Sequence, residues 1–477
     1  MSFESGQTTD GFPRVFALRG GRGAVVLHES GLRHPRAPRL LGETFTRYED
    51  VTHHTVTSRG LRLAARQSVY AFSRSAFVDP NAPDELAREL VDRIARRPGG
   101  REQLDRMWAV EKRAARPRPV RAAPALAALC LAVFAIQLWV GGERIFFAGL
   151  FSDTLVRAGD WWRVVTANLL HGGPAHLLLN GLGLLALGSL VERVLGAART
   201  GIVLGAGALA GMGAGLLAGY EMAVGASGIV FALVGALLWL ELREPARLPA
   251  QWRVPRAVLL LALLADGLLG WVLPAIAGAA HLGGLVAGFL ACACVASGAL
   301  AGRRGGFPVL AVDALLLFAL GAGMAAAGNV ALRDGSPLAG RARLLAERAD
   351  IPPLALNNLA WLIATDPEAS ADDRSTAVRL AERAVEGTGR NDPNVLDTLA
   401  EAQFAAGSAG DAVETIDEAI ALVPEERYFR EQRRRFTGER GPEDRPEPPG
   451  SWITPERRSP APDPEPEPAW PDDGIRA

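Results

Sequence analysis

The 477-residue chain is poor in cysteine and histidine and has almost no excess of either charge. Its three cysteines, Cys130, Cys292 and Cys294, all fall inside apolar runs, so they offer neither a disulfide framework nor the spacing of a zinc site. The formal net charge is −1, and no basic stripe with interleaved aromatic residues occurs, which argues against a nucleic-acid partner. We therefore expect no metal, no other cofactor and no nucleic acid.

Long apolar runs are what the chain does have. Hydrophobic residues make up 49% of it and gather between residues 123 and 328 in blocks of roughly 18 to 25 residues, the length that a helix needs to cross a bilayer. The first block follows about 120 polar residues, so it is not a cleaved signal peptide. The sequence predicts an α-helical polytopic membrane protein with seven spans, at 123–141, 174–194, 199–219, 227–242, 254–274, 279–300 and 307–328.

Arginine and lysine residues gather in alternate connections between these blocks, as they do in cytoplasmic loops. The basic connections precede the first span and follow the second, fourth and sixth spans, whereas "YEMAVGA" and "LPAIAGAA" carry no Arg or Lys. The first loop departs from this pattern, because it holds Arg144, Arg157 and Arg163. We expect a multi-pass protein of the plasma membrane with a cytoplasmic N-terminus and an extracytoplasmic C-terminus.

Residues 1–100 predict a small α+β domain. Short alternating stretches such as "RVFAL", "GAVVLHE" and "SVYAFSRSAF" are broken by Gly, Pro and Asn turns. The segment "DPNAPDELARELVDRIARRPGG" then predicts one closing helix with a proline-flanked start and a glycine stop. The pattern resembles a pleckstrin-homology-like (PH-like) module, whose arginines either contact lipid headgroups or, more simply, are solvated. Residues 101–122 follow as a basic juxtamembrane linker.

Two segments after the last span resemble each other. "LNNLAW" from Leu356 and "LDTLAE" from Leu396 lie at an offset of 40, and the following small and large positions fit tetratricopeptide helix pairs. The sequence predicts tetratricopeptide-like helical repeats over 345–436, which either stiffen the molecule or present a groove to a peptide or protein partner. Residues 437–477 are too rich in proline and charge to bury a core, so we expect a disordered tail.

Five polar residues stand out inside the apolar region: His171, His176, Asn180, Ser227 and His281. An ionisable group at membrane depth is costly and suggests function. A lone serine or histidine there is commonly a packing or hydrogen-bonding residue. The positions of these residues along their spans, however, place all of them in the outer half of the membrane.

This set of side chains can perform acyl transfer. Serine is a weak nucleophile until a base takes its proton, and His281 is such a base for Ser227. His176, Asn180 and the Ser227 backbone N–H can stabilise the oxyanion. No acidic third member is evident near His281, so the sequence predicts a dyad. Small residues that let the serine and histidine helices approach closely are Gly228, Gly235, Gly284 and Gly288.

The motifs "WWRVVTANLLHGGPAHLLLN", "GASG" and "AHLGGLVAG" resemble those of the rhomboid intramembrane serine proteases. The resemblance covers residues 123–300, where it implies a six-helix core, and the span within 301–330 would be an added seventh helix. It implies Ser227 as nucleophile and His281 as general base, with His176 and Asn180 in the oxyanion hole. The residues that it implies as structural support are Trp162, Arg163, His171, Glu192, Gly225, Gly228, Phe231, Gly284 and Gly288.

Other intramembrane proteases fit less well. A metalloprotease needs His-Glu-xx-His. The chain's His-Glu pair, His28 and Glu29, lies in a polar segment and has Leu32 at the position of the second histidine. Asp266 and Asp313 are intramembrane but lack a Gly-x-Gly-Asp context, so we expect packing or hydrogen-bonding roles. The sequence thus predicts a serine endopeptidase acting on single-span or polytopic membrane proteins in the bilayer. The alternative is an inactive rhomboid-like adaptor that binds transmembrane clients. A high ratio of Arg to Lys suggests a GC-rich bacterial source.

Overall fold

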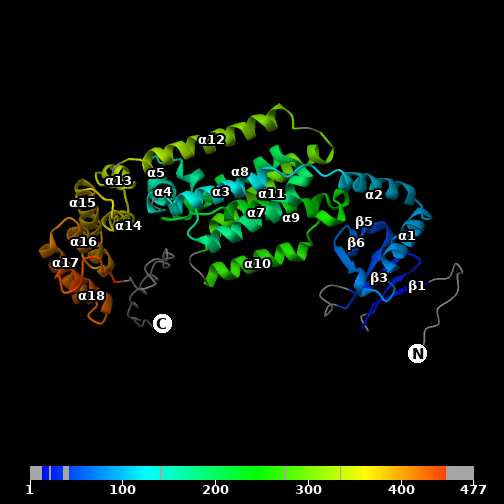
Figure 1. Ribbon diagram of the computed structural model, residues 1–477, viewed down its shortest axis with the longest axis horizontal. Coiled ribbons are helices and arrows are strands. Elements are labelled where there is room, and N and C mark those ends of the chain that lie inside the picture. The colour runs from blue at the N-terminus through cyan, green and yellow to red at the C-terminus, as the bar shows by residue number, and fades with distance from the viewer. Residues whose placement is uncertain are drawn as a thin grey trace, which may run out of the picture.

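The computed structural model describes residues 13–20, 23–35, 42–139, 142–272, 276–303, 305–333 and 335–446. A small strand-rich domain, a bundle of apolar helices and a second group of helices follow one another along the chain (Figure 1). The strand-rich domain and the C-terminal helices lie at opposite ends of the bundle (Figure 1). Most of the predicted tail, from residue 447 onward, lies outside the described residues.

Among its described residues, the N-terminal domain has two antiparallel sheets, two α-helices and two 3₁₀ helices. The first sheet has the order β1-β2-β3-β4, and the second has the order β5-β6-β7. Helix α1 buries Leu86, Leu90 and Ile94 against the strands, whereas Val91 is only half-buried. The small β domain is thus present, and its PH-like identity stays a prediction. The elements are β1 (Arg14–Ala17), β2 (Ala24–Leu27), β3 (Gly31–Pro35), β4 (Glu43–Arg47), η2 (Tyr48–Asp50), β5 (Val51–Thr57), β6 (Gly60–Ala65), β7 (Val69–Ser73), η3 (Arg74–Ala76), α1 (Ala82–Ala95) and α2 (Gly100–Ala115).

Apolar helices make up the central bundle. Six of the described helical stretches are long and apolar enough to cross a membrane: α3 (Ala122–Trp139), α7 (Pro174–Leu195), α8 (Ala197–Leu217), Ala250–Val272, which contains α10 (Arg256–Val272), α11 (Gly278–Leu300) and α12 (Phe307–Ala331). The fourth predicted span corresponds to α9 (Ser227–Arg243), which has 17 residues and a length of about 25 Å. Its crossing of the membrane stays a prediction.

Helix α9 lies at the centre of the bundle, packed against α7, α8 and α11. Its contact with α11 is a backbone contact: a Cβ atom on Gly284 would overlap the Gly228 carbonyl, and one on Gly288 would overlap the Ala232 carbonyl. Small residues allow the axes of the two helices to approach this closely, as they do in other membrane helix pairs. Helix α10 is much less buried than α9, because Leu259 is its one buried residue.

Three short helices connect α3 to α7: α4 (Gly142–Gly149), α5 (Asp153–Arg157) and α6 (Arg163–Thr166). The Arg163 side chain is 1% exposed and holds this connection together. Its Nη1 donates to the carbonyls of Phe147 and Leu150 at 2.8 and 2.9 Å, and its Nε donates to Asp160 Oδ2 at 3.0 Å. The other Asp160 oxygen accepts from Arg341 at 2.8 Å, which joins the connection to the C-terminal helices.

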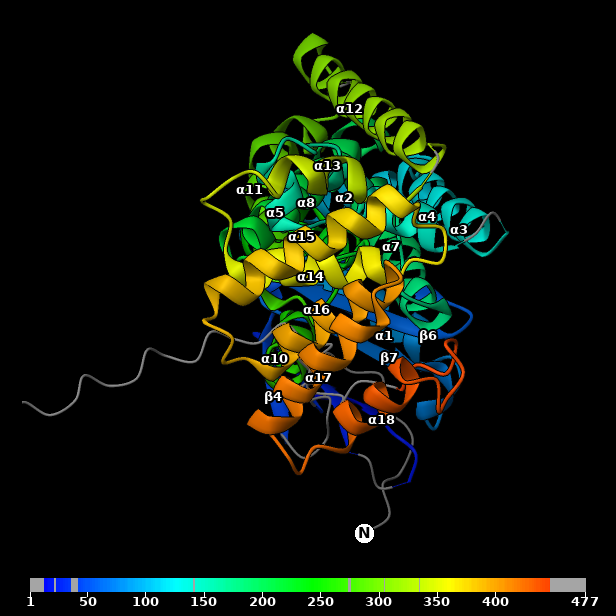
Figure 2. The ribbon, with the colours of Figure 1, turned by 90° about the vertical axis from the view of Figure 1, so that its left-hand side faces the viewer.

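In the part of the chain that the structure describes, six helices follow the bundle: α13 (Ala339–Leu345), α14 (Pro353–Ala364), α15 (Ala371–Gly387), α16 (Pro393–Ala405), α17 (Ala409–Leu422) and α18 (Arg427–Phe436). They pack as neighbouring pairs around one apolar core (Figure 2). The positions that suggested repeats are buried in it, among them Ala377, Ala384, Leu396, Ala412 and Ile416. This burial suits helix pairs, and the tetratricopeptide assignment stays a prediction.

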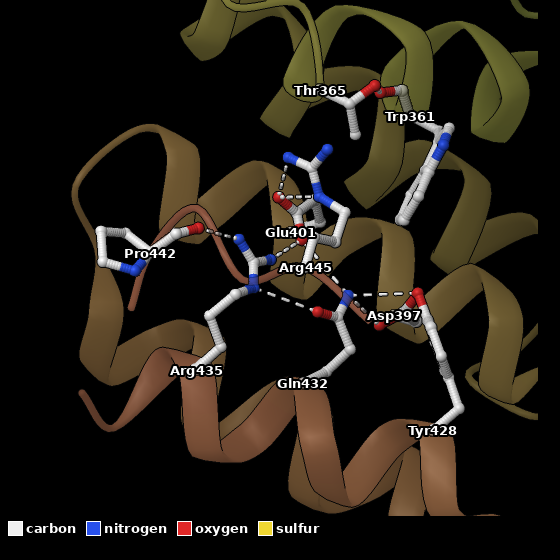
Figure 3. A network of polar contacts seen from close by, with 9 residues as sticks. All are labelled: Trp361, Thr365, Asp397, Glu401, Tyr428, Gln432, Arg435, Pro442 and Arg445. Carbon is white, nitrogen blue, oxygen red and sulfur yellow. Dashed lines mark hydrogen bonds and ion pairs between the residues drawn. The ribbon is translucent and has the colours of Figure 1, made fainter. Parts of the chain in front are cut away.

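A buried polar network fixes α18 to α16 (Figure 3). Glu401 pairs with Arg435 and Arg445, and Asp397 Oδ2 accepts from the Tyr428 hydroxyl at 3.0 Å. Burial, together with the neighbouring Glu401 charge, raises the pKa of Asp397 to about 7. The partners satisfy these polar groups away from water, where an unpaired charge would be costly.

Arginine side chains bond to backbone carbonyls at several helix ends. Arg118 donates to Val194 O at 2.6 Å and Ala299 O at 3.0 Å, in the last turns of α7 and α11. Arg144 donates to Ala331 O at 3.0 Å, the last residue of α12. The final carbonyls of a helix lack intrahelical donors, and a planar guanidinium can serve two of them at once.

The N-terminal domain docks on the connection between α9 and α10, which contains η4 (Pro245–Arg247) and η5 (Ala250–Trp252). Arg253 pairs with Glu241 of α9 at 2.8 Å and donates to Ala65 O of β6 at 2.5 Å. Beside it, His53 is 1% exposed. Its Nδ1 accepts from the Ala250 N–H at 3.0 Å and its Nε2 donates to Glu111 at 2.7 Å.

This docking is expected to weaken in acid. Burial lowers the pKa of His53, against the opposing effect of Glu111. The undocked imidazole therefore takes up a proton first, as the pH falls through about 6.5, and a protonated Nδ1 cannot accept from Ala250. Hydrogen exchange, corrected for intrinsic rates, should show less protection of residues 250–253 at about pH 5.5 than at about pH 7.5. His53→Gln, which does not titrate, should reduce the difference, although His54 still titrates because burial lowers its pKa to about 4. Equal protection of the wild type at both values would contradict the prediction.

Candidate active site

Ser227 is the first residue of α9 and is half-buried. Its Oγ lies 2.9 Å from Nε2 of His281, which comes from the first turn of α11. The first backbone N–H groups of a helix have no intrahelical acceptor, and the helix dipole favours negative charge there. The structure therefore combines a hydroxyl, an imidazole and free backbone donors at one point.

An aromatic ring fixes the plane of the imidazole. Phe231 lies one turn beyond Ser227 on α9 and stacks on His281, with ring centroids 4.3 Å apart and planes 9° apart. The phenyl ring has no hydrogen-bonding group, so it restricts the orientation of the imidazole without competing for its nitrogen atoms. Phe231 is thus in contact with the predicted base, and its supporting role stays a prediction.

His176 and Asn180 lie one turn apart on α7 and face the residues that precede Ser227. Asn180 is 6% exposed, and its Nδ2 has no hydrogen-bond partner. A buried amide donor without an acceptor is costly, and a ligand with a developing negative charge would satisfy it. Gly225 has a φ of +115°, and a Cβ there would lie 3.3 Å from Asn180 Nδ2 and would collide with the His176 ring. Glycine at this position lets backbone, imidazole and amide converge.

His171 is buried behind this group. Its Nδ1 lies 3.2 Å from Leu169 O, and its ring is 5.1 Å from that of His176 in an edge-to-face arrangement. It does not contact Ser227 or His281 through any hydrogen bond among the described residues. The supporting role that the resemblance implied for His171 stays a prediction.

The other residues that the resemblance implied lie away from Ser227. Trp162 Nε1 donates to Ala148 O at 3.2 Å, beside the Arg163 contacts described above. Glu192 lies at the other end of α7, about 24 Å from His176 by helical rise. Its fully buried carboxylate accepts from the backbone N–H groups of Arg121, Ala122 and Ala123 and thereby caps α3. These side chains hold the fold around the site.

The expectation that no acidic group lies near His281 was wrong. Asp266 Oδ1 of α10 is 2.8 Å from His281 Nδ1. The sequence contained only a coarse signal for this contact: Asp266 lies six residues before the end of α10, and His281 lies three residues after the start of the next helix, α11. Residues near the facing ends of consecutive antiparallel helices lie at similar depths. Both groups were recognised as intramembrane, but their proximity was missed.

Comparisons with known proteins cover the same region. The family model described as "Rhomboid domain" matches residues 158–298. The chain is 30% identical over 181 residues to rhomboid protease GluP of Bacillus subtilis, covering 38% of this chain and 34% of that one. It is 34% identical over 148 residues to RHOMBOID-like protein 4 of Arabidopsis thaliana, covering 30% of this chain and 36% of the relative.

A shorter relative is matched over most of its length. The Bacillus subtilis rhomboid protein YdcA is 36% identical over 137 residues, which are 28% of this chain and 67% of YdcA. The chain therefore belongs to the rhomboid family, which includes serine intramembrane proteases. It is a multi-pass membrane protein in which a small β domain precedes the family's helices and further helices follow them.

Replacing Gly225 should disrupt the site. In Gly225→Ala the methyl group would displace His176, and an L-residue would be strained at this φ. Misplacement by about 1 Å can cost on the order of 10²-fold in reactivity, so labelling of Ser227 by a fluorophosphonate should slow by about that factor. Gly219→Ala is the matched control, because its φ of +69° is also positive but nothing lies within 4 Å of the added atom. Equal labelling of the two variants would contradict the prediction.

Proposed function

We propose that this chain is an intramembrane serine endopeptidase that hydrolyses peptide bonds in or near the transmembrane helices of single-span or polytopic membrane proteins. The observation that carries the proposal is the 2.9 Å contact between Ser227 Oγ and His281 Nε2 across two helices. A buried amide donor without a partner, Asn180 Nδ2, lies on the adjacent helix. The family relationship supports the same reaction class.

In the proposed mechanism, the substrate helix unwinds locally and its scissile carbonyl reaches Ser227. The Ser227 oxygen attacks the carbonyl carbon while His281 takes the hydroxyl proton, and then gives it to the leaving amine. Asn180, His176 and the backbone N–H groups at the start of α9 stabilise the oxyanion. Water, activated by His281, then attacks the acyl-enzyme and releases the new carboxylate. A small residue before the cleaved bond is expected from the family resemblance.

We further propose a cytoplasmic N-terminus and an extracytoplasmic C-terminus in the plasma membrane of a bacterium. Supporting this orientation, the basic connections between helices lie at the end where the N-terminal domain docks, near Arg247 and Arg253. Ser227 is the first residue of α9, at the end opposite to Arg243 and to the connection on which the N-terminal domain docks. An odd number of crossings, with α9 included, accounts for the two flanking domains at opposite ends of the bundle (Figure 1). In this orientation the C-terminal helices could engage a partner or substrate on the outer side.

Removing the serine should abolish cleavage. Each protein is reconstituted in vesicles with a single-span substrate that carries a small-residue, helix-destabilising site. The wild type should cleave this substrate, whereas Ser227→Ala and His281→Ala should not. Ser189→Ala is the matched control, because the Ser189 hydroxyl is exposed on α7 and bonds within its own helix. Cleavage by Ser227→Ala at the wild-type rate would overturn the proposal. Substrate that co-purifies uncut with the wild type would favour the adaptor.

Removing the amide donor should slow cleavage without abolishing it. In Asn180→Ala, kcat should fall by on the order of 10²-fold, as when other oxyanion donors are removed, while KM changes little. The amide interacts with a charge that develops only in the transition state, so substrate binding does not depend on it. A rise in KM with an unchanged kcat would assign Asn180 to substrate binding instead.

A further inference from the structure

Asp266 is a carboxylate in the middle of an apolar membrane helix. Its side chain is 21% exposed, and the rest of α10 after Arg256 carries no other ionisable group. A carboxylate at this depth is costly unless a partner compensates it. Its partner is His281, at 2.8 Å between Oδ1 and Nδ1.

The two nitrogens of His281 have different partners. Nδ1 contacts Asp266 and Nε2 contacts Ser227, while the Phe231 ring covers one face. An ionised carboxylate can only accept a hydrogen bond, so Nδ1 carries the proton and donates it to Asp266. Nε2 is then left with a lone pair that accepts from the Ser227 hydroxyl. Without a partner at Nδ1, the imidazole is free to adopt the other tautomer, which cannot take the serine proton.

We propose that Asp266 is a positioning residue that completes a Ser227–His281–Asp266 triad in this chain. It selects the tautomer in which Nε2 is a base, and its charge stabilises the imidazolium that forms when Ser227 loses its proton. The inference rests on the proposed function and deepens it. The carboxylate does not touch the substrate, so its effect on the reaction passes through His281.

Packing alone does not account for the contact. Leu259 is the one buried residue of α10, so the helix is not held in a tight interface that would force Asp266 against His281. The other titratable group that faces His281 from a neighbouring helix is His176 of α7, and it is half-buried. Phe231 offers no charge or hydrogen bond. Among the described residues, Asp266 is therefore the one acidic partner of the base.

Replacing the carboxylate by an amide is the first test. For Asp266→Asn we expect kcat on the vesicle substrate to fall by on the order of 10²-fold with KM little changed; the corresponding change in a water-soluble triad enzyme costs about 10⁴. Asp266→Glu, which keeps the carboxylate, should restore much of the rate.

A matched control is available in the chain's other intramembrane aspartate. Asp313 on α12 lies against Gly201 of α8, so Asp313→Asn removes a membrane carboxylate without touching His281. We expect the wild-type rate from this variant. Equal losses in Asp266→Asn and Asp313→Asn would mean that Asp266 only supports the fold, and would overturn the proposal.

A fluorophosphonate separates this inference from the substrate question. In labelling, the Ser227 oxygen bonds to phosphorus, fluoride leaves, and the hydroxyl proton passes to His281, so no peptide substrate is needed. The rate of labelling of Asp266→Asn should fall by about the same factor as its kcat. Wild-type protein that neither cuts nor labels would refute the proposed function, whereas Asp266→Asn that labels at the wild-type rate would refute the triad alone.

The tautomer gives a readout independent of activity. In ¹⁵N-histidine-labelled wild-type protein in lipid, with His281→Asn used to assign the signal, the neutral ring should be protonated at Nδ1. Asp266→Asn should shift this signal, and Asp313→Asn should not. A resting ring protonated at Nε2 would overturn the proposal even if the protein were inactive.

Discussion

The site depends on the distance at which α9 and α11 pack. Where Gly284 faces the carbonyl of Gly228 and Gly288 faces that of Ala232, backbone meets backbone with no side chain between. Because rigid helices carry Ser227 and His281, any added atom along this contact moves the hydroxyl away from the imidazole. Membrane helices gain little from the hydrophobic effect when they associate, so close packing has to supply the stability that burial supplies in water.

A second constraint is that polar groups in the bundle must find partners in the protein. Glu192 shows this at one end, where its buried carboxylate accepts three backbone N–H groups of α3. Arg163 does the same for carbonyls in the connection before α7. A few buried polar atoms of the bundle have no partner, among them those of Gln137, Asn168, Thr200 and Asn180. The unpaired Asn180 atom is an amide donor, and it lies next to Gly225, two residues before the serine, at the place proposed for the oxyanion.

Sequence reasoning predicted much of this arrangement, and its limits are physical. Span lengths and apolar composition located the helices, and the motifs around Ser227, His176 and His281 placed them in one region. Asp266 was recognised as intramembrane but not as the partner of His281, because pairing across a hairpin depends on helix rotation, which composition does not encode. The docking of the N-terminal domain through His53 and Arg253 was also beyond reach. Interdomain contacts join residues far apart in sequence and leave no periodic pattern.

The arginine contacts at the helix ends carry a consequence for the medium in which the protein can work. Arg118 and Arg144 bond to main-chain carbonyls, so neither partner gains or loses a proton at any pH that a cell meets. The carbonyl contacts need no side-chain carboxylate, although Arg144 also pairs with Glu368, and acidification therefore leaves them in place. A bundle joined in this way can face a compartment of variable acidity while its helix ends stay fixed. The docking of the N-terminal domain through His53, by contrast, would respond to that acidity, because its imidazole accepts a hydrogen bond only when Nδ1 is unprotonated.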